Sequence, residues 1–279
     1  MWHPTPGCAG RSIHHMLHLN AWQGTLANRR AWRGARVHIV TPLQPSTSGG
    51  SGAFLSLGSD GRRYWVKGLN GPQGSRVPVT EQIVGRAGAL IGAPVCVVEV
   101  VYLPSAIAGW AYRPGHLIER GFAHGSVAID KCVEERPGLG DRDKDENAVR
   151  HPGYFALYDW CWGGDTQALL DLDGDRRFHS HDHGSFLPPG GGWDIPNLQQ
   201  SVGAAHELGS DGAGMDMVEV ARLATRLENV TRAEILQILT RIPRSWPTTD
   251  VELETVGAFL EERAPQVAAR LRARFGGNP

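Results

Sequence analysis

The stretch Ala156–Phe186, ALYDWCWGGDTQALLDLDGDRRFHSHDHGSF, decides how the rest of the chain is interpreted. An aromatic-rich run with helical character ends at the break Gly163-Gly164. Ala168–Leu170 and the residues around Phe178 then predict two short strands. Asp173-Gly174-Asp175 between them is typical of a hairpin turn, because glycine takes a positive φ easily and aspartate tolerates it. The sequence therefore predicts a helix followed by a tight β-hairpin.

Two isolated carboxylates flank this hairpin. Asp165 precedes the first strand and Asp182 follows the second, so an antiparallel pair returns both to one end. Phosphoryl transfer uses such a pair, one aspartate orienting the attacking hydroxyl and the other holding Mg²⁺ on the phosphates. The alternative is that both cap turns in loops. Asp159 is a second candidate for the aspartate that orients the hydroxyl. It lies in the predicted helix among aromatic residues, so we expect it to be structural.

Composition limits the class of protein. The chain has 279 residues, 41% of them hydrophobic, which is enough for two lobes with a core between them. A net charge of −1 gives no field that favours nucleic acid or an anionic membrane. No apolar run approaches the roughly 18 residues of a membrane span. The four cysteines lack CxxC spacing, which argues against structural zinc and for a reducing, cytoplasmic setting.

Residues 1–36 are interpreted as an N-terminal extension. This segment has no Asp or Glu and is rich in Arg and His. It lacks the apolar core of a secretory signal, so a plain extension that need not be ordered is favoured over an organelle-targeting peptide.

A loop rich in glycine and serine lies between two predicted strands, Val37–Val40 and Ala53–Leu57. Its sequence over Gln44–Gly52 is QPSTSGGSG. Small residues let backbone N–H groups approach phosphate oxygens closely. No Gly-Lys-Ser/Thr follows, so this is not a Walker A loop, and a flexible linker is the alternative.

Lys67 ends a third predicted strand, Tyr64–Lys67. Further on, Thr80 is a plausible N-cap for an apolar-periodic helix that begins at Glu81. A strand lysine followed by a helix glutamate is the ion pair with which kinases position the α- and β-phosphates. The alternative is a surface lysine and a glutamate that favours a helix N-terminus.

The middle of the chain contains a candidate hinge. After a predicted strand at Val95–Leu103, the run Leu117–Phe122 resembles a strand that leads into a linker. In a two-lobed nucleotide-binding protein this run would lie beneath the adenine, which makes Glu119 a candidate cofactor contact. The charge run Asp141–Glu146 predicts an exposed loop within Asp130–Arg150.

The C-terminal third is predicted to be helical. One helix is expected over Met215–Val230, a second is capped by Thr231, and a third runs from Val251 to about Phe275. Their apolar stripes are interpreted as core.

The order of these motifs along the chain resembles that of the HipA-like kinase family. The resemblance is to its compact branch, which lacks an extra N-terminal domain. The resemblance spans about Thr41 to Arg270. The matching residues are Ser48-Gly49-Gly50-Ser51-Gly52-Ala53, Asp60-Gly61, Tyr64–Lys67, Asn70–Gly74, Glu81, Gly92–Val95, Asp165, Asp182-His183-Gly184, Ile242-Pro243, Trp246 and Leu260–Arg263.

The resemblance implies an α+β, two-lobed, protein-kinase-like fold, with an antiparallel N-lobe sheet over residues 37–122 and a mostly helical C-lobe over 123–279. It implies that Mg²⁺ and ATP bind between the lobes. By match, Asp165 would be the catalytic aspartate and Asp182 a metal ligand. The residues implied to contact the nucleotide are Gly49, Gly50, Ser51, Gly52, Lys67 and Glu81.

The chain departs from this family at one point. Related kinases have Arg after the catalytic aspartate and then Asn as a second metal ligand. Thr166 follows Asp165 here, and Gln167, or else Asp171, would have to bind the metal. Gln offers a neutral carbonyl oxygen as Asn does.

Three functions are therefore carried forward. The first is an ATP-dependent kinase that moves the γ-phosphate to a hydroxyl acceptor, with Ser or Thr of a protein as the first expectation. The acceptor itself cannot be identified from the sequence. The second is a nucleotide-binding pseudokinase that regulates a partner. The third is a metal hydrolase, because His179, His181 and His183 would share one strand face beside Asp182 and could bind Zn²⁺.

Overall fold

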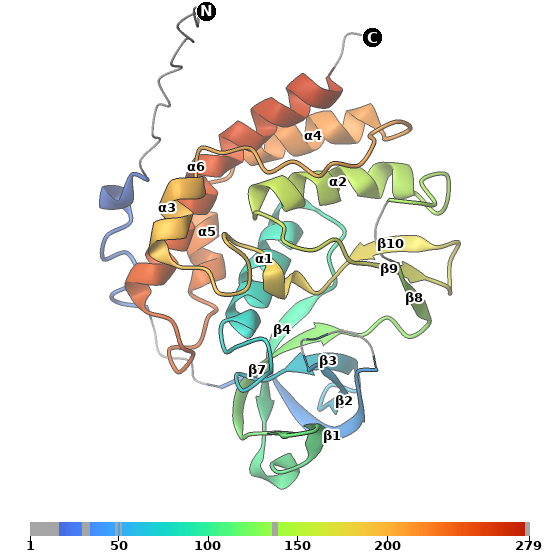
Figure 1. Ribbon diagram of the computed structural model, residues 1–279, viewed down its shortest axis with the longest axis vertical. Coiled ribbons are helices and arrows are strands. Elements are labelled where there is room, and N and C mark those ends of the chain that lie inside the picture. The colour runs from blue at the N-terminus through green and yellow to red at the C-terminus, as the bar shows by residue number, and fades with distance from the viewer. Residues whose placement is uncertain (1–16, 30–33, 48–49, 51, 136–138, 277–279) are drawn as a thin grey trace, which may run out of the picture.

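The computed structural model describes residues 17–29, 34–47, 50, 52–135 and 139–276. A β-barrel lies at one end of the molecule and a group of helices at the other, with a small sheet and one helix between them (Figure 1). The expected α+β class, with an N-terminal sheet region followed by a helical region, is confirmed.

The barrel is closed and has the strand order β1-β2-β3-β7-β4. Neighbouring strands are antiparallel except β1 and β4, which run parallel and close the barrel. Tyr64, which is fully buried, anchors its interior together with Phe54 and Val101. The strands are β1 (Val37–Pro45), β2 (Phe54–Gly58), β3 (Arg63–Lys67), β4 (Val98–Leu103) and β7 (Gly121–Val127).

The expectation that the Leu117–Phe122 run leaves the barrel was wrong. Only its last two residues belong to β7, which pairs with both β3 and β4. The chain leaves the barrel after Val127. The run GFAHGSV resembles a linker because it is rich in small residues, but Gly125 is small for a packing reason. A Cβ there would lie 2.8 Å from Val101 Cγ1 and 3.2 Å from the Tyr64 ring.

A small hairpin precedes β7. It consists of β5 (Ala111–Arg113) and β6 (His116–Leu117), and it follows the short helix η2 (Ser105–Ile107). Tyr112 of β5 is buried in the barrel core against Phe54, with ring centroids 5.0 Å apart. The hairpin is thereby fixed to the barrel.

Helix α1 (Val77–Ile91) lies between the barrel and the other helices (Figure 1). It begins earlier than the sequence predicted, so Thr80 is not its N-cap. Pro78 stands in the first turn, where no N–H donor is needed. Thr80 Oγ1 instead donates to the Arg76 carbonyl at 3.2 Å and accepts from Trp193 Nε1 at 2.9 Å. Gly92, at φ 78°, ends the helix.

The predicted hairpin is present as β9 (Ala168–Asp171) and β10 (Arg177–Ser180). A third strand, β8 (Cys132–Glu135), pairs antiparallel with β9 inside a stretch that was expected to be a loop. The charged residues nearby concealed this short strand. The three strands form a separate sheet that faces the barrel end of the molecule.

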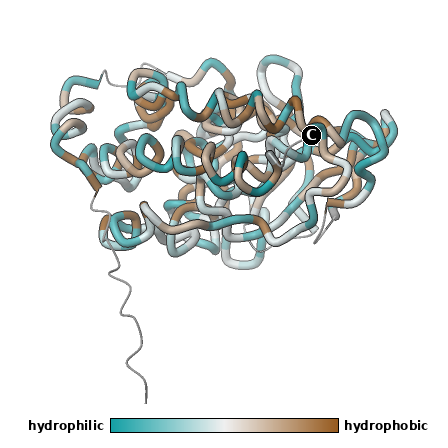
Figure 2. Tube along the Cα trace, turned by 90° about the horizontal axis from the view of Figure 1, so that it is seen from above, coloured by the Kyte–Doolittle hydropathy of each residue, from teal (hydrophilic) through white to brown (hydrophobic). Residues whose placement is uncertain are grey.

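Helices make up the remainder, and brown and teal residues alternate along them, as expected for helices with one buried side (Figure 2). Thr231 and Thr249 both form capping boxes, which confirms the two predicted helix starts. The elements are η1 (Leu19–Ala21), α2 (Asn147–Trp160), η3 (His183–Ser185), α3 (Ile195–Ser201), α4 (Met217–Glu228), α5 (Arg232–Leu239) and α6 (Asp250–Phe275).

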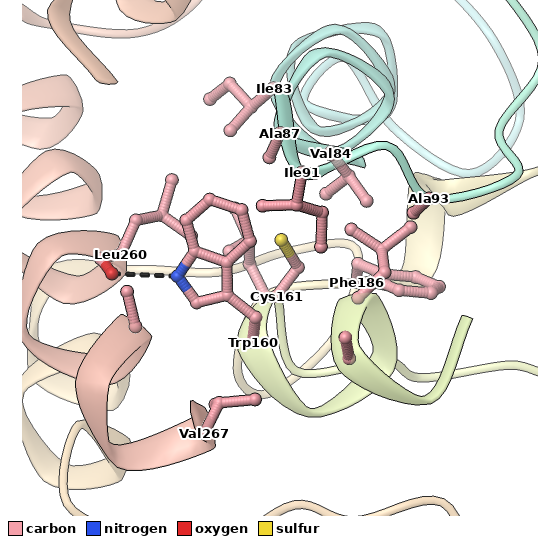
Figure 3. Packing of buried hydrophobic residues seen from close by; sticks show 14 of the residues in the cluster. Ile83, Val84, Ala87, Ile91, Ala93, Trp160, Cys161, Phe186, Leu260 and Val267 are labelled. Carbon is pink, nitrogen blue, oxygen red and sulfur yellow. Dashed lines mark hydrogen bonds between the residues drawn. The ribbon is translucent and has the colours of Figure 1, made fainter. Parts of the chain in front are cut away.

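The main core is built around Trp160 at the end of α2. Its indole packs near Ile83, Ala87 and Cys161, and its Nε1 donates to the Leu260 carbonyl at 2.8 Å (Figure 3). The same core therefore joins α1 to α2 and α6, and it fixes the position of α1 relative to the helical region.

Residues 17–29 pack on α6. Trp22 and Leu26 are buried, and Trp22 Nε1 donates to Glu261 Oε2 at 2.6 Å. Gly257 lies directly under the Trp22 ring, where a Cβ would collide with it. This part of the N-terminal extension is therefore ordered against the helical region. Among the described residues, no helix is long and apolar enough to span a membrane.

Candidate functional site

A cavity of about 320 Å³ lies between the barrel and the three-stranded sheet. Its barrel wall is built on β3 and β7, where Lys67 pairs with His124 and Trp65 pairs with Ser126. The opposite wall is the three-stranded sheet, and we call it the floor of the cavity. The residues that line the cavity are Gln44, Ser46, Thr47, Ala53, Trp65, Lys67, Glu81, Cys96, His124, Ser126, Val127, Cys132, Glu134, Gln167, Leu169, His181 and Asp182.

Lys67 is buried and pairs with two carboxylates. Its Nζ donates to Glu81 Oε1, and it donates to Asp182 Oδ1 at 2.6 Å. The structure thus brings together three predicted site residues from a strand, a helix and the loop after the hairpin. The alternative of a surface lysine and a helix-start glutamate is wrong, because Glu81 is buried and lies in the second turn of α1.

The charges in this cluster stabilise each other. Burial alone would lower the pKa of Lys67, but Glu81 and Asp182 outweigh it and raise that pKa above its usual value. Burial would raise the pKa of Glu81, but Lys67, with His124 and His183, holds it well below its usual range. The cluster therefore contains a charged lysine and a charged glutamate at neutral pH.

Asp182 adopts a left-handed backbone conformation with φ 52° and ψ 58°. This conformation is uncommon outside glycine and is often found at functional sites. The next residue, His183, donates its backbone N–H to Glu81 Oε2 at 3.0 Å. Gly184 then passes close to α1, where a Cβ would lie 2.7 Å from Val77 Cγ1. The loop is thus held directly against the helix that carries Glu81.

Asp165 lies at the same end of the hairpin as Asp182, because the Ser180–Ala168 pair is the last in the register. It is exposed and does not line the cavity itself. Gln167 does line the cavity, and its Nε2 donates to Asp165 Oδ2 at 2.9 Å. Gln167 therefore connects the exposed aspartate to the interior of the site.

The glycines before Asp165 have a different role from the one expected. Neither has a positive φ, and the turn is made at Trp162, with φ 56°. A Cβ on Gly163 would collide with the Tyr158 ring, and one on Gly164 with the Ser185 carbonyl. Gly163 is small so that the chain can pass the Tyr158 ring, and Gly164 so that the Asp165 loop can lie against the loop that follows Asp182.

Asp159 is structural, as expected. It is buried, accepts from Arg263 Nη2 at 2.8 Å and from Arg270 Nε at 2.6 Å. Arg263 is itself fully buried and also donates to backbone carbonyls.

Residues 44–47, 50 and 52 of the glycine-rich loop are described, and the predicted contacts Gly49 and Ser51 lie outside the described residues. Arg113 of β5 donates to the Gly50 carbonyl at 3.1 Å. Gly52, at φ 67°, lies under Pro72 and Tyr112. Ser46 and Thr47 of the loop, and Ala53 just after it, line the cavity.

Glu119 was assigned to the hinge, and the structure separates it from the site. It is exposed, precedes β7 and does not line the cavity. The chain instead passes from the barrel to β8 through residues 128–131. Ser126, Val127 and Glu134, on either side of this connection, line the cavity and were missed because the strand boundaries were misplaced.

His179, His181 and His183 were considered as a metal cluster. β10 ends at Ser180, so of the three only His179 lies on the strand, His181 follows it and His183 lies in η3. Throughout the described ranges, no group of three or more His, Cys, Asp or Glu residues is arranged to hold a metal ion. Burial lowers the pKa of His181, and the charge of Lys67 lowers it further. The carboxylates of Asp182, Glu134 and Glu81 raise it.

His124 lies deep in the cavity and was not singled out from the sequence. Gln82 Nε2 lies 2.9 Å from its Nδ1, and its Nε2 faces Glu81 Oε2 at 3.9 Å. Burial lowers the pKa of His124 to about 4. A neutral histidine therefore packs behind the ion pair.

Comparison with known structures identifies the architecture. The crystal structure of the Helicobacter pylori proinflammatory kinase CtkA matches with a TM-score of 0.54, over 86% of this chain and 96% of that chain. The chain has a protein-kinase-like fold. Sequence identity in this match is 10%, so the likeness concerns the fold. No family model and no curated protein matches the sequence.

Proposed function

We propose that this protein is an ATP-dependent phosphotransferase related to the HipA-like kinases. The observation that carries the proposal is the position of Lys67, which pairs with Glu81 and Asp182 in the cavity between barrel and floor. In protein kinases a strand lysine of this kind is held by a helix glutamate and contacts the α- and β-phosphates. The glycine-rich loop lies beside the same cavity and would cover the phosphates with Gly49, Gly50, Ser51 and Gly52.

The residues fit a magnesium ion that is shared with phosphates. Mg²⁺ in such sites uses one or two protein oxygen ligands together with phosphate oxygens and waters. Asp182 supplies a carboxylate and Gln167 an amide carbonyl in the lining of one cavity. The ion, when bound, neutralises charge on the phosphates. Asp182 and Gln167 would hold it, while Lys67 contacts the phosphates from the barrel side.

Asp165 would orient the hydroxyl that attacks. It stands exposed at the rim, so an acceptor can approach it from solvent without entering the cavity. A serine or threonine on the surface of another protein could reach such a position. The amide of Gln167 fixes one carboxylate oxygen of Asp165. The other carboxylate oxygen would then take the proton from the attacking hydroxyl group.

A second function, a nucleotide-binding pseudokinase, is favoured by one observation. Gln167 stands where related kinases place Asn, and its amide already binds Asp165. A longer side chain that is engaged with the catalytic carboxylate would hold a metal less firmly. This arrangement would allow nucleotide to bind without transfer.

Transfer of labelled γ-phosphate separates the two functions. The purified protein would be incubated with Mg-ATP and a mixture of protein and small-molecule acceptors, with Asp165→Ala as the inactive control. Label transfer by the wild type alone supports the kinase. Calorimetric binding of Mg-ATP without transfer supports the pseudokinase, and absence of binding would contradict both.

A further inference from the structure

His206 lies against the turn that leads to Asp165, and it was not singled out from the sequence. It belongs to the segment between α3 and α4 and does not line the cavity. Its imidazole stacks on two aromatic rings. The ring centroids are 4.2 Å apart for Trp162 and 5.4 Å apart for Tyr158, with interplanar angles of 13° and 9°. Tyr158 is part of α2 and Trp162 makes the turn, so the stack joins the end of the helix to the turn.

The same imidazole is hydrogen-bonded to the turn. Its Nε2 lies 2.6 Å from the carbonyl oxygen of Gly163. A carbonyl oxygen can only accept, so Nε2 carries a proton and donates it. Gly163 is two residues before Asp165 in the chain. His206 therefore contacts the turn through the face of its ring and also through its edge.

The turn needs support from outside. Trp162 has φ 56°, a left-handed conformation that is uncommon for a bulky residue. Such a conformation persists only where the surrounding structure holds it. Leu187, in the loop after Asp182, donates its N–H to the Trp162 carbonyl at 3.1 Å. His206 holds the next carbonyl in the same way, from a different part of the chain.

His206 is itself fixed to the helical region. Its backbone N–H donates to Asp159 Oδ1 at 3.2 Å, and Arg263 and Arg270 of α6 hold that carboxylate. The guanidinium of Arg263 also lies over the Trp162 ring, 5.0 Å from its centroid. The buried ion pairs of α6 are thus connected to the turn through His206.

The stack lies near Asp165. Burial raises the pKa of Tyr158, and the negative charge of Asp165 raises it further. Gln167 holds one carboxylate oxygen of Asp165 at 2.9 Å, but the backbone that carries this carboxylate comes directly from the turn. The position of Asp165 at the rim therefore depends on how firmly the turn is held.

We propose that His206 is a positioning residue for Asp165. It holds residues 162–164 so that the carboxylate stays where it orients the attacking hydroxyl. The inference rests on the proposed function, because it takes Asp165 as the aspartate with that role. His206 does not line the cavity, so its loss should lower the transfer rate and leave nucleotide affinity unchanged.

The transfer rate at saturating Mg-ATP, measured with the acceptor mixture described above, tests this role. His206→Ala removes both the stack and the hydrogen bond. It should lower the rate roughly 10²-fold, the usual cost of displacing a reacting group by about 1 Å. His206→Phe keeps the stack and should lower the rate roughly tenfold, as for one lost hydrogen bond. His206→Gln keeps a donor of similar reach and should transfer faster than His206→Ala.

Two controls separate positioning from general stability. Calorimetry should give all three variants the wild-type dissociation constant for Mg-ATP. Trp22→Phe is the matched control, because it also keeps a ring and loses one hydrogen bond, to Glu261 on α6. Its melting temperature should fall while its transfer rate stays at the wild-type value. Should His206→Ala not fold, as judged by its melting curve, the Phe and Gln variants carry the comparison.

The Asp165→Ala background shows whether His206 acts through Asp165. In that background His206→Phe should cause no further loss of rate, because two changes that act through one group do not add. A general loss of structure would slow the transfer in both backgrounds by the same factor.

Two results would overturn the inference. One is a folded His206→Ala or His206→Phe protein that transfers phosphate at the wild-type rate. The other is a His206→Phe change that slows the wild type and Asp165→Ala by equal factors. Either result leaves the proposed kinase intact. A wild type that binds Mg-ATP and transfers no phosphate would remove the proposed kinase and this inference together.

Discussion

Lys67 Nζ lies 2.6 Å from Asp182 Oδ1, although the two residues are 115 positions apart in the chain. This contact joins the barrel to the loop after the hairpin, and Glu81 on α1 pairs with the same ammonium. Three regions of the fold therefore meet at one buried positive charge.

Replacement of Lys67 should affect both binding and stability. Lys67→Met removes the ammonium and leaves Glu81 buried without its main partner. Loss of one partner from a buried pair typically destabilises by about 3–5 kcal/mol. We expect a lower urea midpoint and a reduced ATP-induced rise in melting temperature. Lys67→Met/Glu81→Gln should recover part of the stability but not the ATP response. An unchanged ATP response in the single variant would remove Lys67 from the site.

Asp182→Asn should abolish Mg²⁺-dependent transfer and leave the protein folded. The amide keeps the shape of the side chain and loses the charge that would hold the cation, while Lys67 retains Glu81 as a partner. Phosphate transfer is measured across a range of Mg²⁺ concentrations, with circular dichroism as the check on folding. Turnover by the folded variant at wild-type rate would show that Asp182 is not the metal ligand.

Asp165 and Asp159 should behave in opposite ways. Asp165→Ala should lower the transfer rate by roughly 10²–10⁴-fold with little change in nucleotide affinity, because its contact is to the acceptor. Asp159→Ala should instead destabilise the protein by about 3–5 kcal/mol, since it leaves Arg263 buried without its carboxylate. Rates and denaturation curves are compared for both variants. Near-full transfer by a folded Asp165→Ala protein would contradict the mechanism.

Gly164→Ala should slow the reaction by displacing Asp165, although it changes no residue of the proposed site. The added methyl group would collide with the Ser185 carbonyl and push the Asp165 loop away from the loop that carries Asp182. We expect a lower kcat with nucleotide affinity near that of wild type. Gly192→Ala is a matched control, because no atom lies within 4 Å of a Cβ there. Equal kcat values for the two variants would show that the close approach does not matter.

Stability should fall as the pH drops from about 6.5 toward 4. Burial lowers the pKa of both His124 and His151 to about 4, from an ordinary value of 6.5. In this window the unfolded chain binds protons that the folded protein does not, so protonation favours unfolding. The stabilisation is complete above pH 6.5 and is lost progressively below it. Urea midpoints measured across this range check the prediction, and NMR titration of the two imidazoles should show their low pKa values. A midpoint that does not change over the range would refute it.

Much of the fold could be predicted because the signals were local. The capping residue Thr231, the Asp-Gly-Asp turn and the final helix all follow from short-range chemistry. The pairing of Lys67 with Glu81 could be proposed because Lys67 ends a patterned strand and Glu81 lies in a patterned helix. These features depend on neighbours in the sequence, which the sequence itself displays.

The errors arose where packing across the chain decides the outcome. Gly125 looks like part of a linker until Val101 and Tyr64 are seen to cover it. The same misplaced boundary put Glu119 in the hinge and left out Ser126 and Val127. Gly164 was given a conformational role, although its neighbour Ser185 is the reason for its size. No local pattern could reveal which distant residue fills the space beside a glycine.

The ordered segment 17–29 has a consequence for motion. Because Trp22 and Leu26 hold it to α6, the chain approaches β1 from the helical region, and after β7 it passes to β8 in the floor of the cavity. The barrel is thus tethered on both sides of its sequence. Its middle is held as well, because the chain passes from β3 through α1 to β4, and the main core fixes α1 to α2 and α6. Displacement of the barrel relative to the helices would strain all three connections, so we expect the cavity to be formed before a ligand enters it.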